Sequence, residues 1–151
     1  MDDLEGRLTA ARAANLDKLL ENMPWSAQPI DSNYAPSSIS TPASANTFSA
    51  WTQLFALNEI TSDFMIVAVV ARPDHTSAVN AEIEIGKGNS PNEETIASIC
   101  WEPIGAKENV MFSFPVPIRV AANTRIAGRV KHSSASGLAY FIHPVIQKLP
   151  L

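Results

Sequence analysis

The chain has 151 residues, of which 46% are apolar and only 17% charged, and its formal net charge is −4. The length suits one domain with an appendage. The acidic balance, with no run of more than two Lys or Arg residues, argues against a nucleic-acid partner. A charged fraction below the usual value of about 25% is typical of a small all-β domain, or of a chain that covers surface in contacts with other chains.

No segment predicts a membrane or export role. The longest apolar run, Phe64 to Ala71, has eight residues, whereas a helix that crosses a bilayer needs about 20. The start of the chain, Met1-Asp2-Asp3, is acidic, and no apolar segment typical of a signal peptide follows it. We therefore expect synthesis in the cytoplasm and no membrane partner.

Residues 1–23 predict an N-terminal α-helix used for oligomerisation or docking. Asp2 or Asp3 can cap it, and Asn22 and Pro24 end it. The residues between are good helix formers. Apolar side chains recur at helical spacing, at Leu4, Leu8, Ala11, Leu16, Leu19 and Met23.

Part of this stripe also fits a short heptad series, Leu4, Leu8, Ala11 and Asn15, which ends at Lys18. A polar Asn at an inner position can fix the register of a coiled coil. Three arrangements stay open: parallel association of helices from several subunits, docking on a partner protein, and packing on the domain of the same subunit.

Residues 24–46 predict an extended linker rich in Pro and Ser. Its prolines, which make such a segment semi-extended, are Pro24, Pro29, Pro36 and Pro42. Apolar residues interrupt the polar run at Trp25, Ile30, Tyr34 and Ile39. We therefore expect parts of the linker to lie along a surface, with Trp25 a candidate for a subunit junction.

Residues 47–151 predict β-structure throughout, because runs rich in Val, Ile, Phe and Thr alternate with turn signals and no helical pattern separates them. Such a series indicates an antiparallel β-sandwich or a barrel. The expected strands are Thr47–Leu57, Phe64–Ala71, Val79–Gly86, Glu94–Trp101, Asn109–Phe114, Arg125–His132 and Leu138–Lys148.

The patterns within these strands predict which side chains are buried. Phe64–Ala71 is apolar on both faces and suits a central strand, whereas Glu82 and Glu84 alternate with apolar residues and should face solvent. Cys100 lies in an apolar pattern and is expected to be a buried, inert thiol. Trp51 and Trp101 lie inside strand patterns and are expected in the core.

No constellation of residues indicates catalysis. The histidines, His75, His132 and His143, have no metal-ligand spacing, and no serine lies in a Gly-x-Ser-x-Gly turn. Glu82 and Glu84 could be mistaken for a glycosidase pair but fit a solvated strand face. We expect no enzyme activity, no cofactor and no metal.

Two segments resemble parts of tailed-bacteriophage virion proteins. Phe114 to Arg129 contains a proline-spaced strand, a turn and then Thr124-Arg125-Ile126-Ala127-Gly128-Arg129. Leu8 to Asp17 follows the Leu-Thr-x-x-Arg-Ala-x-x-Leu-Asp pattern of helices in phage structural proteins. With the strands between them, the similarity covers most of the chain. The turn carries Ala122-Asn123 where such segments often have Ala-Gly, and Asn tolerates the left-handed backbone that the turn needs.

The resemblance implies a jelly-roll-like sandwich that acts as a capsid decoration, or cement, protein. Such a protein, made in the host cytoplasm, would sit on the outer surface of the capsid as a homotrimer and bind the major capsid protein or another virion protein. The runner-up is a head- or tail-fibre module that binds host-surface glycan, and a third reading is a bacterial carbohydrate-binding module.

The proline-spaced segment also predicts an edge strand. Pro115 and Pro117 remove backbone donors at alternate positions, so that side of the strand cannot pair. Nearby, Arg119, Arg125 and Arg129 are candidates to bridge acidic groups on a neighbouring subunit, or else are ordinary surface arginines.

Overall fold

The computed structural model describes residues 37–102 and 109–149, which form eight strands and no helix. The helix predicted over residues 1–23, and its residues from Leu4 to Met23 together with Trp25, lie outside the described residues. The strands are β1 (Ser37–Ser40), β2 (Thr52–Phe55), β3 (Phe64–Pro73), β4 (Ala81–Lys87), β5 (Glu94–Trp101), β6 (Val110–Val120), β7 (Ile126–His132) and β8 (Ala139–Lys148).

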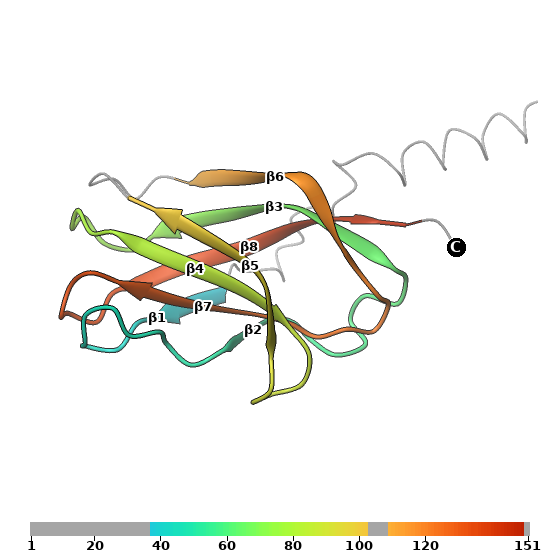
Figure 1. Ribbon diagram of the computed structural model, residues 1–151, viewed down its shortest axis with the longest axis horizontal. Helices are drawn as coiled ribbons and strands as arrows, with labels where there is room; N and C mark the ends of the chain where they lie inside the picture. The colour runs from blue at the N-terminus through green and yellow to red at the C-terminus, as the bar shows by residue number, and fades with distance from the viewer. Residues whose placement is uncertain (1–36, 103–108, 150–151) are drawn as a thin grey trace, which may run out of the picture.

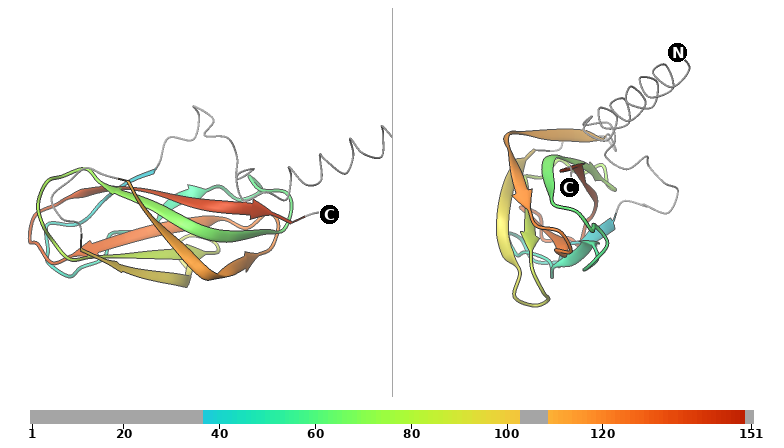
Figure 2. Two further views of the ribbon diagram at one scale, coloured as in Figure 1. Left: turned by 90° about the horizontal axis from the view of Figure 1, so that it is seen from above. Right: turned by 90° about the vertical axis from the view of Figure 1, so that its right-hand side faces the viewer.

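The strands form two four-stranded sheets (Figure 1). Sheet A has the order β1-β8-β3-β6 and sheet B the order β2-β7-β4-β5, and all neighbours are antiparallel. The first strand pairs with the last, and the pairing continues inward: β1 with β8, β2 with β7, β3 with β6 and β4 with β5. The chain therefore has the pairing of one long hairpin that is wound around the core. This is the eight-strand arrangement of a jelly roll. The predicted antiparallel β-sandwich is therefore confirmed, and Figure 2 shows its layers from two further sides.

Alternation along each strand builds the core between the sheets. On β4, Ala81, Ile83 and Ile85 are buried, while Glu82 and Glu84 point to the other face. Burying one such isoleucine stabilises the fold by about 1.5–3 kcal/mol. The largest fully buried side chains include Tyr140, Phe64, Ile39, Ile66, Ile126 and Ile142.

Strand β3 is central, as its apolar sequence predicts, because β8 and β6 flank it. Phe64, Ile66 and Val69 are fully buried in the core. Met65 and Val70 lie on the opposite side of the strand and are half-buried. Sheet A therefore carries apolar side chains on its outer face as well as on its inner face.

The predicted boundary between linker and sandwich is wrong. Ser37–Ser40 lies inside the predicted linker 24–46 but forms β1, which pairs with Ala139 to Ile142 of β8. Ile39 is only 1% exposed and packs in the core. The sequence of this segment is as polar as a linker, because only one residue of this short strand points into the core and only that residue has to be apolar.

Two further strand boundaries differ from the prediction. The expected strand Thr47–Leu57 is shortened to Thr52–Phe55, and the segment before β2 is joined to β7 only by separate backbone hydrogen bonds, from Asn46 to His132 and from Ser49 to Val130. The expected strand Asn109–Phe114 continues through both prolines to Val120. The continuation is possible because β6 is an edge strand of sheet A, as the prolines predicted. Asn123, after β6, has a φ of 60°, the left-handed backbone expected there.

A buried histidine joins three segments at one end of the sandwich. His132 is 2% exposed; its Nδ1 accepts a hydrogen bond from the Ser134 backbone N–H at 3.0 Å. The proton therefore lies on Nε2, which donates to Thr41 Oγ1 at 2.5 Å. Thr41 Oγ1 in turn donates to the Leu138 carbonyl at 3.1 Å. The network is complete only while the imidazole is neutral.

This network predicts a loss of stability on mild acidification. Burial, and then the charge of His75, lowers the pKa of His132 below its usual 6.5. The unfolded chain therefore binds more protons below that pH, and the stabilisation is lost as pH falls from about 7.5 to about 5. Urea unfolding at about pH 7.5 and about pH 5 measures the change in the free energy of unfolding. Both pH values lie above the usual pKa of carboxylates, so carboxylates contribute little to the change. His132→Gln should reduce the pH dependence, and an unchanged free energy of unfolding in the native chain would contradict the prediction.

Candidate functional site

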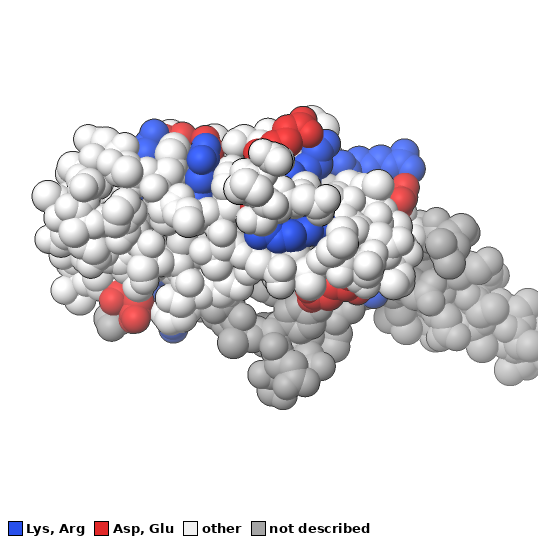
Figure 3. Space-filling view, turned by 90° about the horizontal axis from the view of Figure 1, so that it is seen from below, with Lys and Arg blue, Asp and Glu red and all other residues white. Residues whose placement is uncertain are grey.

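The two inner faces are filled by the core, so a ligand or partner has to use the outer faces or the edges. The outer face of sheet B carries a ladder of ion pairs across β4 and β7. Glu82 lies opposite Lys131 and Glu84 opposite Arg129. In each pair a side-chain nitrogen of the cation lies 2.6 Å from the Oε2 atom of the glutamate. Figure 3 views another side of the sandwich, from below, and most of that surface carries no charged side chain.

Hydroxyl groups of β5 extend the ladder. Ser98 donates to Glu82 at 2.8 Å, and Thr95 donates to Glu84 at 3.3 Å. The hydrogen bonds from Lys131 and then Ser98 lower the pKa of Glu82 below its usual 4.5, so this carboxylate stays ionised at neutral pH. The prediction that Glu82 and Glu84 lie opposite the core is confirmed, and both are engaged by cations.

Two aromatic rings cover the middle of the ladder. The Arg129 guanidinium carbon lies 4.4 Å from the ring centres of both Phe48 and Trp51. A Cβ atom at Gly86 would lie 2.7 Å from the Trp51 ring, so only glycine fits beneath it. The prediction of a core position is therefore wrong for Trp51, because its ring lies over Arg129 and Gly86 on the outer face of sheet B. Trp101 does pack against the core.

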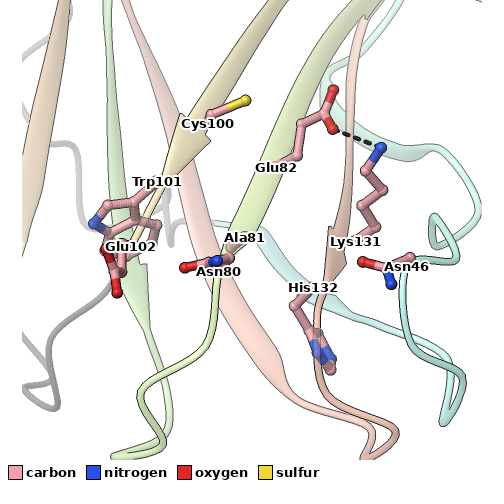
Figure 4. A pocket seen from close by; sticks show the side chains of 9 residues that line it. All are labelled: Asn46, Asn80, Ala81, Glu82, Cys100, Trp101, Glu102, Lys131 and His132. Carbon is pink, nitrogen blue, oxygen red and sulfur yellow. Dashed lines mark ion pairs between the residues drawn. The ribbon is translucent and has the colours of Figure 1, made fainter.

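A hollow lies at one end of sheet B, lined both by residues of the outer face, such as Glu82 and Lys131, and by residues that face the core, such as Trp101 (Figure 4). The hollow has a volume of about 470 Å³, and the ends of β4, β5 and β7 form its floor. Figure 4 shows Glu82 of β4 and Lys131 of β7 pointing toward each other from neighbouring strands, joined by their ion pair. Its main polar and aromatic lining residues are Asn46, Asn80, Glu82, Trp101, Glu102 and Lys131.

Cys100 lies at this hollow and is exposed, so the prediction of a buried, inert thiol is wrong. The register of β5 explains the error, because Cys100 pairs with Glu82 and shares its outward direction. Its neighbours Ile99 and Trp101 point to the core. The apolar sequence around Cys100 therefore forms a strand with one face toward the core and the Cys100 thiol on the outer face.

The structure places the three candidate arginines in ion pairs within their own chain. Arg119 pairs with Asp63 at 3.0 Å, and Arg129 with Glu84 at 2.6 Å. Arg125 pairs with Glu93 at 2.5 Å, where their side chains are 12% and 0% exposed. Bridges from these arginines to a neighbouring subunit stay a prediction, as do contacts of Leu4, Leu8, Ala11, Asn15, Leu16, Leu19, Met23 and Trp25, which lie outside the described residues.

The edge strand β6 carries a proline bulge, defined here as residues 114–117. Ile66 and Ala68 of β3 pair with Ile118 and Ser113, so the single residue Val67 faces the whole bulge. Val116, at the tip, is 80% exposed, and Met111 on the same strand is 63% exposed. Both were missed from the sequence, although a valine between two prolines is a signal for an outward apolar side chain.

Neither a metal-binding cluster nor a membrane-spanning helix is found among the described residues. They hold no group of three or more His, Cys, Asp or Glu side chains that could bind a metal ion. No helix within residues 37–102 or 109–149 is long and apolar enough to span a membrane. The expected absence of a cofactor, a metal and catalysis stays a prediction.

No protein-family model and no curated protein matches the chain. Among solved structures, the chain is similar to a CBM4 carbohydrate-binding module, at 9% identity and a TM-score of 0.34, with 74% of this chain and 94% of that chain covered. It is also similar to a Clostridium thermocellum endo-1,4-beta-D-xylanase 10B structure, comprising CBM22-1 and GH10 modules complexed with xylohexaose, at 11% identity and a TM-score of 0.31. That match covers 76% of this chain and 25% of the xylanase chain. Likenesses of this size assign no family and no ligand.

The buried ion pair of Arg125 and Glu93 predicts that removing Arg125 alone lowers the free energy of unfolding more than replacing both residues does. Arg125→Met should lower the free energy of unfolding by about 3–5 kcal/mol, because it leaves the buried Glu93 carboxylate without its cation. Adding Glu93→Gln should recover part of this loss. Urea unfolding measures both variants.

Arg119→Met is the matched control, since that arginine side chain is 73% exposed and its ion pair contributes about 1 kcal/mol or less. Equal losses for Arg125→Met and Arg119→Met would contradict the assignment of Arg125 to the fold of its own chain.

Proposed function

We propose that this chain is a non-enzymatic structural protein of a tailed-bacteriophage virion, a capsid decoration protein that binds the outer shell as a homotrimer. The observation that carries the proposal is the proline bulge of β6, which holds Val116 80% exposed on an edge strand. The resemblance of residues 114–129 and 8–17 to phage virion proteins supports the same role.

The bulge has the properties of a docking feature. Pro115 and Pro117 fix the backbone dihedral φ, so little conformational entropy remains to be lost on binding. The same prolines remove backbone donors from the free edge, which blocks uncontrolled strand pairing. An apolar tip on a rigid edge therefore favours contact through side chains with one shaped partner, and the partner we assign is the major capsid protein.

The carboxylates on the outer face of sheet B support a binding role over catalysis. Glu82 and Glu84 are each engaged by a cation and a hydroxyl group. A general acid needs a raised pKa, and the pKa of Glu82 is lowered. The pair is therefore better suited to hold the sheet surface than to exchange protons with a substrate.

The second candidate is a head- or tail-fibre module that binds host-surface glycan. The hollow on sheet B favours it, because amide, carboxylate and ammonium groups meet there beside an indole ring. This role needs the hollow to be the functional surface, whereas decoration needs the bulge. The two candidates therefore predict different sensitive residues.

Val116→Asp should weaken binding of the purified protein to particles that lack it by about ten- to a hundredfold. Burying a valine side chain contributes about 1.5–3 kcal/mol, and a charge at the tip would be desolvated without a partner. Gln53→Glu is the matched control, because it adds a charge at an exposed position on the other sheet. Co-sedimentation with particles measures both, and equal binding of the two variants would refute the role of the bulge.

The homotrimer is tested by light scattering at micromolar concentration, which should give about three times the chain mass of 16.3 kDa. A chain that lacks residues 1–23 should keep its strand signal in circular dichroism, because the described sandwich begins at Ser37, but should lose trimerisation. A monomer at every concentration would exclude the trimer. If the truncated chain unfolds, residues 1–23 are required for the stability of the sandwich and do not serve assembly alone.

A further inference from the structure

The hollow on sheet B has the chemistry of a ligand site that differs from the docking bulge. It lies across β4, β5 and β7, whereas the bulge lies on β6 of sheet A. We propose that this hollow binds a neutral, polyhydroxylated ring, the chemical class of uncharged sugars. The inference supplies residues and a ligand class for the glycan-binding candidate, and it does not rest on shell binding.

Two amide side chains supply free hydrogen-bonding groups. The backbone of Asn46 is fixed by its N–H bond to the His132 carbonyl at 2.7 Å, and that of Asn80 by its N–H bond to Ser133 Oγ at 3.1 Å. Neither carboxamide forms a hydrogen bond in the described part of the chain. Each amide offers both a donor and an acceptor, which matches the hydroxyl groups of a sugar.

The charges of the hollow favour a neutral ligand over an anion. Lys131 is paired with Glu82 at 2.6 Å. Glu102, which is exposed, adds a second carboxylate to the lining, so the formal sum over Glu82, Glu102 and Lys131 is one negative charge. A phosphate or carboxylate ligand would meet no unpaired cation there. Lys131 still has N–H donors beyond the one that its ion pair uses.

An apolar surface completes the recognition. Trp101 lines the hollow from the core side, where its partly buried ring makes edge contacts with Phe112 and Tyr140, with ring centres 5.8 Å and 6.2 Å apart. Ala81 lies beside it in the lining. A sugar ring presents C–H groups as well as hydroxyl groups, so a wall of this kind beside polar groups can contact both. A ligand with charges alone would leave the indole unused.

The experiment measures binding of the full-length protein to glucose, galactose, mannose, N-acetylglucosamine and their neutral oligomers by saturation-transfer NMR. The double variant N46G/N80A removes both amides, and glycine keeps the positive φ of 57° that Asn46 adopts. Its affinity for the bound sugar should be about tenfold weaker, because the hydrogen bonds from both amides to the sugar are lost. Gln53→Ala is the control on the same sheet, outside the hollow, and should bind as the native chain does.

Cys100 provides a second readout inside the hollow. It is exposed and is the sole cysteine, so alkylation by iodoacetamide reports on access to this position. The bound sugar should slow alkylation of the native chain and have little effect on N46G/N80A. The proposal is overturned if no sugar of the panel binds, if the double variant binds equally well, or if sialic acid or glucose 6-phosphate binds more tightly than the neutral sugars. Shell binding can fail or succeed independently of these outcomes.

Discussion

Burial of one face of each sheet against the other is the interaction on which the rest of the molecule depends. Pairing of β1 with β8, β2 with β7 and β3 with β6 joins segments far apart in the sequence, while β4 pairs with β5, the next strand along the chain. These pairs stabilise the chain only when the inner faces meet, because isolated pairs of strands are marginal in water. Since the inner faces are then filled, any function has to use the outer faces, the ends or the edges.

The outer surfaces differ because their strands differ. Sheet B places Glu82 and Glu84 opposite Lys131 and Arg129, so its outer face is polar and internally neutralised. Sheet A ends in β6, where prolines turn the edge into a projecting apolar bulge around Val116. One molecule therefore presents a polar hollow and a rigid apolar edge at separate places, which allows two binding events without competition for the same residues.

The sequence predicted the parts of the fold that alternation or uniform apolarity determines locally. The two-faced strand around Ile83 and the central strand from Phe64 were predicted correctly for that reason. The edge position of β6 followed from proline chemistry, and the left-handed backbone of Asn123 from the tolerance of asparagine for that geometry.

The missed features depend on tertiary context. Strand β1 was missed because its single inward residue, Ile39, gives no period to detect. The outward position of Cys100 depends on the register of β5, and that of Trp51 on the packing of its ring against Arg129 of β7. The hollow combines Asn46, Asn80 and residues from three strands, which no local pattern brings together.

Electron microscopy of the phage particle that we propose carries this chain tests the central claim most directly. The proposed decoration role predicts density for the sandwich on the outer capsid surface, in groups of three, with the proline bulge around Val116 against the shell. Particles without the protein should release their genome at a lower temperature, because a ligand that binds only the assembled shell stabilises it by mass action. Density at the tail or head fibre, with unchanged particle stability and reduced attachment to host cells, would contradict the account.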